Sequence, residues 1–153
     1  MRIYQIRSSE VHQALSRSEG ALIYHSPLAF IRTLLENEAN PNPLINDGFP
    51  PLIAALSCSQ PQSGSPGRQD IVEIIKLLLS FGAGPDQRGI NDYTPLHMAV
   101  SERNLQALTI LLEAGADPRL QMRIDDYETP REMAERANLR EMAALLAQYE
   151  TRL

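Results

Sequence analysis

Cysteine is nearly absent from this sequence, and its scarcity excludes two kinds of scaffold. Cys58 is the single cysteine, so the chain has neither an intrachain disulfide framework nor a cysteine-rich zinc site. Long apolar runs are also missing: Ile74-Ile75 and Leu77–Leu79 are separated by Lys76 and fall far short of the roughly 20 residues of a membrane-spanning helix. The first residues contain no apolar stretch typical of a signal peptide. We therefore expect a cytoplasmic protein with no membrane contact.

An excess of basic charge is missing as well. The chain has 14 basic and 19 acidic residues, a formal net charge of −5. A nucleic-acid-binding protein needs a basic face that displaces counterions from phosphates, so we expect no nucleic-acid partner. Residues 91–153 hold 11 of the acids against seven arginines, which concentrates the negative charge in the C-terminal third.

The length and composition indicate one folded unit. A chain of 153 residues fits a single domain with its own core. Hydrophobic residues make up 43% and charged residues 22%, a balance typical of folded rather than disordered chains. We expect one domain over residues 1–153.

Internal similarity is the strongest signal present. One motif occurs three times, as LLENEANP at 34–41, LLSFGAGP at 78–85 and LLEAGADP at 111–118. A second motif also occurs three times, as PPLIAA from Pro50, TPLHMA from Thr94 and TPREMA from Thr129. Successive copies are 44 residues apart and then 33 or 35. This spacing indicates a repeat array that carries one insertion.

Each unit is predicted to contain two helices. Thr-Pro begins the first, because Thr caps free backbone N–H groups and Pro is tolerated in the first turn. The second shows apolar residues at helical spacing, namely Leu105, Leu108, Leu111 and Leu112 in one unit and Val72, Ile75, Leu78 and Leu79 in another. Gly82 and Gly115 are predicted to end these helices, and the polar segment that follows suits a hairpin.

These motifs resemble the ankyrin repeat, whose pattern carries Thr-Pro-Leu-His and a later Leu-Leu-x-x-Gly-Ala-Asp-Pro. Residues 92–99 together with 111–118 match that pattern nearly completely. Residues 129–132 keep Thr-Pro but continue with Arg and Glu. Polar residues are expected there in a terminal unit, because its outer face meets water.

The resemblance implies an all-α fold, an α-solenoid of four helix-turn-helix units with short β-hairpin finger loops. The units fall at about residues 8–41, 45–87, 90–121 and 123–151, and an insertion at 59–69 lies inside the second. The first unit matches only in its second helix, so its first helix, Ser8–Ser16, is inferred from the architecture.

The insertion, SQPQSGSPGRQ, is rich in Pro, Gly and Ser and has no apolar residue. That composition predicts a mobile surface loop whose deletion leaves the helices intact. Two interpretations stay open: tolerated slack at the surface, and a loop that contacts a partner.

No residue pattern indicates catalysis, a metal site or a cofactor. None of the three histidines has the i+4 partner of a helical metal motif. The resemblance gives His97 a structural role, bonding loop backbone and fixing the turn. Cys58 carries no nucleophile motif, and Asp125 and Asp126 suit a solvated hairpin tip. We expect no catalytic residue, no metal and no cofactor.

What remains is surface, and the resemblance implies that it binds protein. In ankyrin proteins the finger tips and the exposed side of each first helix line a concave groove. Carried over to this chain, the protein-binding positions are Asn46, Asp47, Phe49, Ser57, Ile90, Asn91, Tyr93, Ser101, Glu102, Asp125, Asp126, Glu128 and Arg136. Aromatic residues at successive tips are typical of binding hot spots, although Phe49 and Tyr93 could equally pack between neighbouring fingers.

The sequence therefore predicts a non-catalytic module that captures one protein partner. The acidic last finger favours a basic partner. A monomeric immunity-type inhibitor or an adaptor fits a small chain of this kind. Two alternatives stay open: an enzyme or ligand-binding accessory protein that uses Asp125, Asp126 and His97, and a structural scaffold subunit.

Overall fold

The computed structural model describes Ile23 and residues 26–43, 49–58, 67–89, 92–123 and 127–152. These ranges contain α2 (Leu28–Glu36), α3 (Pro51–Ser57), α4 (Ile71–Ser80), α5 (Pro95–Ser101), α6 (Leu105–Glu113), α7 (Pro130–Arg136) and α8 (Arg140–Glu150). No β-strand lies within them. The predicted all-α class is confirmed, while the predicted helix Ser8–Ser16 lies outside the described residues.

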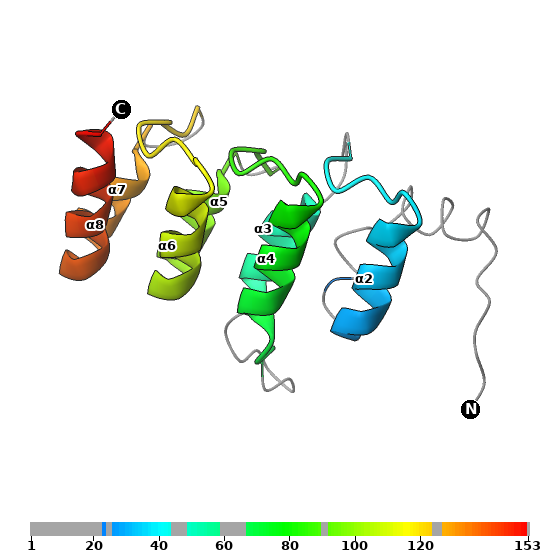
Figure 1. Ribbon diagram of the computed structural model, residues 1–153. Coiled ribbons are helices and arrows are strands. Elements are labelled where there is room, and N and C mark those ends of the chain that lie inside the picture. The colour runs from blue at the N-terminus through cyan, green and yellow to red at the C-terminus, as the bar shows by residue number, and fades with distance from the viewer. Residues whose placement is uncertain are drawn as a thin grey trace.

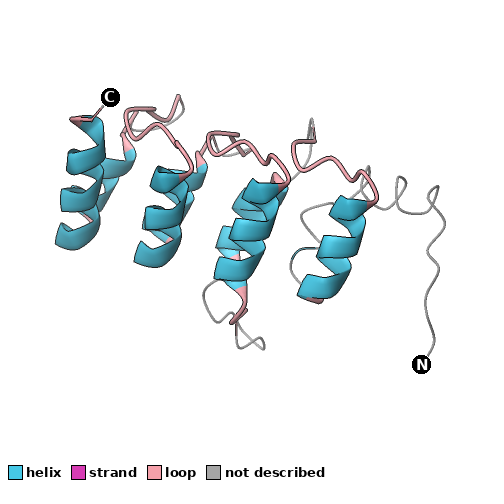
Figure 2. Cartoon of the chain, viewed as in Figure 1, coloured by secondary structure: helices cyan, strands magenta, loops and turns pink. Residues whose placement is uncertain are grey.

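The helices form two layers. In Figure 1, α2, α4, α6 and α8 lie in front of α3, α5 and α7, and the connecting loops run along one edge, as the pink segments of Figure 2 show. Helix α3 packs on α4, α5 on α6 and α7 on α8, and neighbours within each layer are also in contact. This arrangement is the predicted α-solenoid. We call the loops 37–50, 81–94 and 114–129 the first, second and third fingers.

The first helix of each described pair begins at a proline: Pro51, Pro95 and Pro130. Thr94 and Thr129 precede two of these prolines, and their hydroxyl oxygens accept the backbone N–H groups three residues further on. Pro50 precedes the third and has no side chain that could do so. The cap predicted from Thr-Pro is therefore confirmed in two helix pairs and absent from the α3–α4 pair.

The second helices end as predicted, with one departure. Gly82 and Gly115 follow α4 and α6 with φ of 88° and 91°. Glu38 holds the corresponding place after α2 with φ of 65°. In all three, the residue that follows donates its N–H to a carbonyl inside the helix. Glutamate thus adopts a left-handed conformation that is much easier for glycine.

The core lies between the layers. In α6, Leu108, Leu111 and Leu112 are buried as predicted, and Leu105 is partly exposed. The buried face of α4 is rotated from the predicted stripe: Ile71 and Ile74 are buried with Ile75 and Leu78, while Val72 and Leu79 are only partly buried. The reason is that α4 contacts α3, α2 and α6, so its buried face is wider than one row of side chains.

Arg68, near the end of the predicted insertion, is anchored to the preceding part of the chain. Its N–H donates to the carbonyl of Cys58 at 3.1 Å. Its Nη1 donates to the carbonyls of Ile23 and Ser26 at 2.6 and 2.7 Å, and its guanidinium also pairs with Asp70. Deleting all of 59–69 would remove these bonds, so the end of the predicted mobile loop is anchored by polar contacts. The effect of the deletion on the helices stays a prediction. Residues 59–66 lie outside the described residues.

Candidate protein-binding surface

Seven of the predicted protein-binding residues lie in the described part of the chain. Ser101 and Arg136 are exposed, and Phe49, Ser57, Tyr93, Glu102 and Glu128 are partly exposed. The other six, Asn46, Asp47, Ile90, Asn91, Asp125 and Asp126, lie outside the described residues. The binding role of all 13 residues stays a prediction.

The two predicted aromatic residues face inward in part. Phe49 and Tyr93 both pack against the hydrophobic core. The ring of Tyr93 lies 5.8 Å from the ring of His97, centroid to centroid. These aromatic rings therefore help to hold the fingers on the helices, and only part of each is available to a partner.

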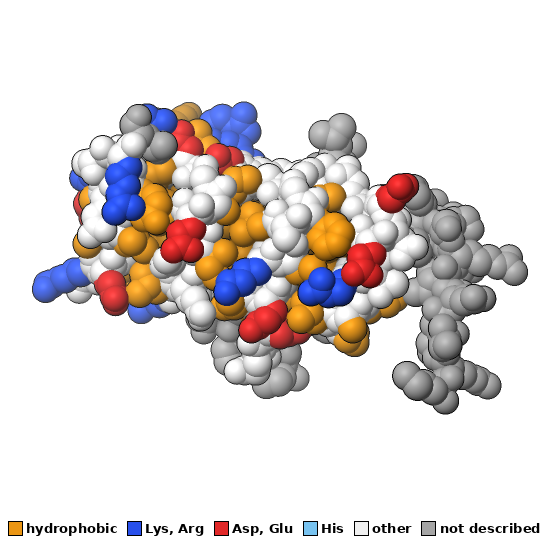
Figure 3. Space-filling model, viewed as in Figure 1, with side chains coloured by type: hydrophobic (Ala, Val, Ile, Leu, Met, Phe, Trp, Pro, Cys, Tyr) orange, Lys and Arg blue, Asp and Glu red, His pale blue; other side chains and the backbone are white. Residues whose placement is uncertain are grey.

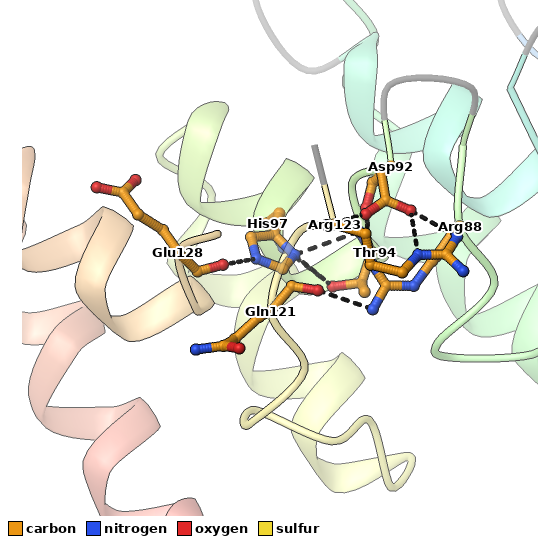
Figure 4. Close-up of polar contacts among 7 residues, drawn as sticks. All are labelled: Arg88, Asp92, Thr94, His97, Gln121, Arg123 and Glu128. Atoms are coloured by element: carbon orange, nitrogen blue, oxygen red, sulfur yellow. Dashed lines mark hydrogen bonds and ion pairs between the residues drawn. The ribbon is translucent and has the colours of Figure 1, made fainter. Parts of the chain in front are cut away.

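Asp92 joins the second finger to the third. Arg88 donates to its carboxylate at 3.0 Å and to its carbonyl oxygen at 2.9 Å. From the third finger, Nη2 and Nε of Arg123 lie 2.7 and 2.9 Å from Oδ1 of Asp92, and the Arg123 N–H donates to Oδ2. Arg88 also donates to the carbonyl of Gln121 (Figure 4). We call Arg88, Asp92, Gln121 and Arg123 the Asp92 network.

The charge of Asp92 is stabilised by its partners. Its side chain is 4% exposed, and burial alone would raise the pKa of the carboxyl. The hydrogen bonds from the side chain and backbone of Arg123, together with the positive charge of Arg88, outweigh burial and lower that pKa below its ordinary value. The folded chain therefore favours the ionised form of the Asp92 carboxyl.

His97 forms a second link between the same two fingers. The N–H of Thr94 donates to Nδ1 of His97 at 3.3 Å, and Nε2 of His97 donates to the carbonyl of Glu128 at 3.0 Å (Figure 4). Burial lowers the pKa of His97, which favours this neutral form. The imidazole is fully buried with both nitrogens bonded, as expected of the structural role. In this arrangement it is not accessible as a general base.

The fingers are also joined near their bases by side chains that accept backbone N–H groups. Oδ1 of Asn42 accepts the N–H of Gly84 at 2.6 Å, and Oδ1 of Asp86 accepts the N–H of Asp117 at 2.9 Å. Each bond runs from one finger to the next. Together with the Asp92 network, they fix the spacing of successive fingers.

Glu128 and Arg136 form an ion pair on the predicted surface. Nε and Nη2 of Arg136 donate to the two carboxylate oxygens of Glu128 at 2.7 and 2.8 Å. The hydrogen bond from Arg136 lowers the pKa of the Glu128 carboxyl. The pair brings together two residues that sequence reasoning placed on one surface, and it neutralises part of the predicted acidic finger.

Tyr127 was missed by sequence reasoning. It is 62% exposed, the highest value for a large hydrophobic side chain among the described residues, and its φ is 55°. It stands two residues before Thr129, as Asp92 stands before Thr94 and Gly48 before Pro50. That shared register was a usable signal. Glycine suits a left-handed backbone best, so an aromatic residue at the position that Gly48 holds in an earlier unit suggests a role for its side chain.

The front layer presents a different kind of surface. Figure 3 shows Lys and Arg side chains alternating with Asp and Glu side chains over α2, α4, α6 and α8, with apolar side chains between them. Phe81, which follows α4, is 36% exposed. This face therefore has mixed charge.

The described residues contain no cluster of three or more His, Cys, Asp or Glu side chains suited to a metal ion. Cys58 is buried, its Sγ lies 3.0 Å from the carbonyl of Ala54, and burial raises the pKa of the thiol to about 11. A thiol with that pKa is a poor nucleophile near neutral pH. Within the described ranges, no helix is long and apolar enough to span a membrane.

Stacked helix pairs, joined by loops that bond to one another, define an α-helical repeat protein. A family model described as "Ankyrin repeats (3 copies)" matches residues 28–122 and 63–152. The chain therefore belongs to the ankyrin repeat family. Ankyrin repeats are protein–protein interaction modules and in general are not catalytic.

Three curated relatives each match about half of this chain. Protein fem-1 homolog A from Bos taurus is 36% identical over 72 residues, which cover 46% of this chain and 11% of the relative. An L-asparaginase from Dirofilaria immitis is 38% identical over 71 residues, covering 46% and 12%. Potassium channel KOR2 from Oryza sativa subsp. japonica is 31% identical over 80 residues, covering 52% and 11%. The chain thus spans a small part of each relative's length.

Proposed function

We propose that this chain is a non-catalytic module that captures one protein partner on its finger surface. By finger surface we mean the predicted positions at the fingers and on α3, α5 and α7, together with Tyr127. The observation that carries the proposal is Tyr127, a 62% exposed aromatic on a finger tied to its neighbour by two sets of bonds.

Tyr127 has the properties of a binding hot spot. Tyrosine brings a large apolar area and a polar tip, and few rotatable bonds are frozen when it is buried. Its exposure in the free chain leaves that area available. Because the finger is held at its base, binding loses less conformational entropy than it would from a free loop.

Charge supports a basic partner. Asp125 and Asp126 immediately precede Tyr127, and 11 acids stand against seven arginines in residues 91–153. Glu102 is a further acidic residue, on the turn that follows α5. Since Arg136 pairs with Glu128, we assign the steering charge to Asp125 and Asp126. Rim charges of this kind mainly accelerate association.

The role that fits best is a monomeric cytoplasmic inhibitor of the immunity type, or an adaptor. The names of the curated relatives describe whole proteins of which this chain matches 11–12%, so they do not assign its partner. An enzymatic role through His97 is disfavoured, because the imidazole is buried and bonded on both nitrogens.

Site-specific photo-crosslinking in the native host tests the proposal. A photoreactive phenylalanine analogue at Tyr127 should attach one protein, and the same analogue at Phe81 should not, although both side chains are exposed. Excess unmodified chain should compete for that product. Equal crosslinking from both positions, or none from position 127, would contradict binding through the fingers.

A further inference from the structure

Asp92 occupies a backbone position that is unfavourable for its residue type. Its φ is 61°, and the repeat register places Gly48 at the same point of the preceding unit. Left-handed backbone disfavours residues with a Cβ, although Asp and Asn tolerate it better than most. Its carboxylate is also nearly buried, which is unfavourable for a charge unless it is paired. Glycine would avoid both penalties.

Aspartate at this position is explained by the two arginines that its carboxylate binds. Arg88 comes from the same finger and Arg123 from the next one, and both donate to the carboxylate. The carboxylate is nearly buried while the Arg123 side chain is 73% exposed, so desolvation of Asp92 offsets much of the attraction. Such a pair can still select one arrangement of the groups it joins.

The groups that this ion pair arranges are the two arms of the third finger, one of which carries Tyr127. The N–H of Met122 donates to the carbonyl of Glu128 at 3.0 Å and closes the base of the third finger. Arg123 follows Met122 and Tyr127 precedes Glu128, so they stand on opposite arms one step beyond that bond. Asp92 holds the Arg123 arm, and His97 holds the Glu128 arm (Figure 4).

We propose that Asp92 is a positioning residue: through Arg123 it fixes the third finger so that Tyr127 meets its partner in one orientation. The partner is then a protein that accepts one aromatic ring at a fixed place relative to the second finger. The benefit to binding rests on the function proposed above, whereas the positioning itself belongs to the free chain and is measured there.

A fluorescent reporter measures the positioning without a partner. The sequence has no tryptophan, so Tyr127→Trp gives the full chain a single indole reporter at the finger. Adding Asp92→Gly should lower the residual anisotropy of this indole on the nanosecond scale by about twofold or more, because one arm of the finger is released. Glu38→Gly is the matched control, since it also places glycine at a left-handed residue but lies after α2.

Unchanged anisotropy in the Asp92→Gly chain would overturn the proposal. So would a fall of its urea unfolding midpoint below that of the wild type, because the network would then stabilise the core rather than position a finger. Arg123→Gln provides a second variant, which keeps the backbone N–H bonded to Asp92 and should give a smaller effect in the same direction.

Affinity measurements with the partner that crosslinking identifies distinguish this inference from the proposed function. Asp92→Gly with Tyr127 retained should weaken its binding by about tenfold, through lost pre-organisation. Undiminished affinity would overturn the positioning role. If Tyr127→Ala binds normally, the proposed function fails, and the anisotropy result still decides whether Asp92 orders the finger.

Discussion

Nε2 of His97 lies 3.0 Å from the carbonyl oxygen of Glu128, which is 31 residues further along the chain and in the next finger. The other ring nitrogen, Nδ1, accepts the N–H of Thr94. The Thr94 hydroxyl also lies 2.8 Å from Nδ1, but a proton added to Nδ1 would break the bond from the Thr94 N–H, and burial disfavours the charged ring. The neutral imidazole is therefore the form that links the two fingers.

The stability of the fold should fall as the pH drops below the ordinary histidine value. Burial lowers the pKa of His97 in the folded chain, so the unfolded chain takes up the proton first, at about 6.5. The contribution of His97 is full above that value and is lost as the pH falls through the folded-state pKa.

Urea unfolding of the wild type and His97→Gln from about pH 7.5 to about pH 5 measures this loss. The difference in unfolding free energy between the two proteins should shrink toward acid. A difference that stays constant over this range would contradict a neutral, buried His97. The other two histidines are present in both proteins and cancel in the comparison.

Replacing Glu38 by Gly should stabilise the chain. Glu38 has φ of 65° at the end of α2, so glycine removes backbone strain of about 1 kcal/mol, partly offset by a more flexible unfolded chain. Gly115→Ala is the reverse test: its φ is 91° and nothing lies within 4 Å of an added Cβ, so the loss reflects the backbone alone. Thermal midpoints should move in opposite directions, and a fall for Glu38→Gly would contradict this account.

Residues 60–66 of the insertion should be removable without loss of the bonds that Arg68 makes. Deleting residues 60–66 joins Ser59 to Gly67, which has φ of 74°, between Cys58 and Arg68, whose backbone groups are already bonded. That sequence suits a type II turn with glycine at its third residue. The helical circular dichroism signal and the unfolding midpoint should be nearly unchanged.

Arg68→Ala in the full chain should be much more damaging than that deletion. It leaves the carbonyls of Ile23 and Ser26 without their donor, a loss of about 1–3 kcal/mol. Urea unfolding measures both proteins. If the deletion lost more stability than Arg68→Ala, residues 60–66 would be part of the packed structure.

Leu111→Ala should destabilise the whole array. The side chain is fully buried in α6, between the layers, so its truncation should lower the unfolding free energy by about 2–5 kcal/mol. Leu105→Ala, on the same helix but only partly buried, is the control and should lose less. Circular dichroism and the indole fluorescence of a Tyr127→Trp chain should report the same midpoint, because each repeat supports its neighbour.

The sequence predicted the solenoid because its motifs encode local structure that recurs. Thr94 and Thr129 cap helices, and Gly82 and Gly115 end them, as their types imply. The rotated face of α4 was not predictable from one stripe, because its burial depends on three neighbouring helices.

The candidate site was harder to predict, since its central bonds join residues about 31 positions apart. Asp92 lies in the familiar motif, yet nothing local indicates that Arg123 would reach its carboxylate. Arg68 fell within a segment of loop-like composition, which hid its bonds to Ile23 and Ser26. Tyr127 was within reach, because its place in the repeat is that of Gly48.

Calorimetric titration measures the contribution of Tyr127 to binding. The partner that photo-crosslinking identifies is titrated separately with the wild type, with Tyr127→Ala and with Phe81→Ala. Tyr127→Ala should weaken binding by about 2 kcal/mol or more, as truncation of a central aromatic does at other interfaces. Phe81→Ala, which removes an exposed aromatic beside α4, should bind like the wild type. Both variants should keep the wild-type unfolding free energy within about 0.5 kcal/mol. Equal affinity of the wild type and Tyr127→Ala would place the binding surface elsewhere and contradict capture through the fingers.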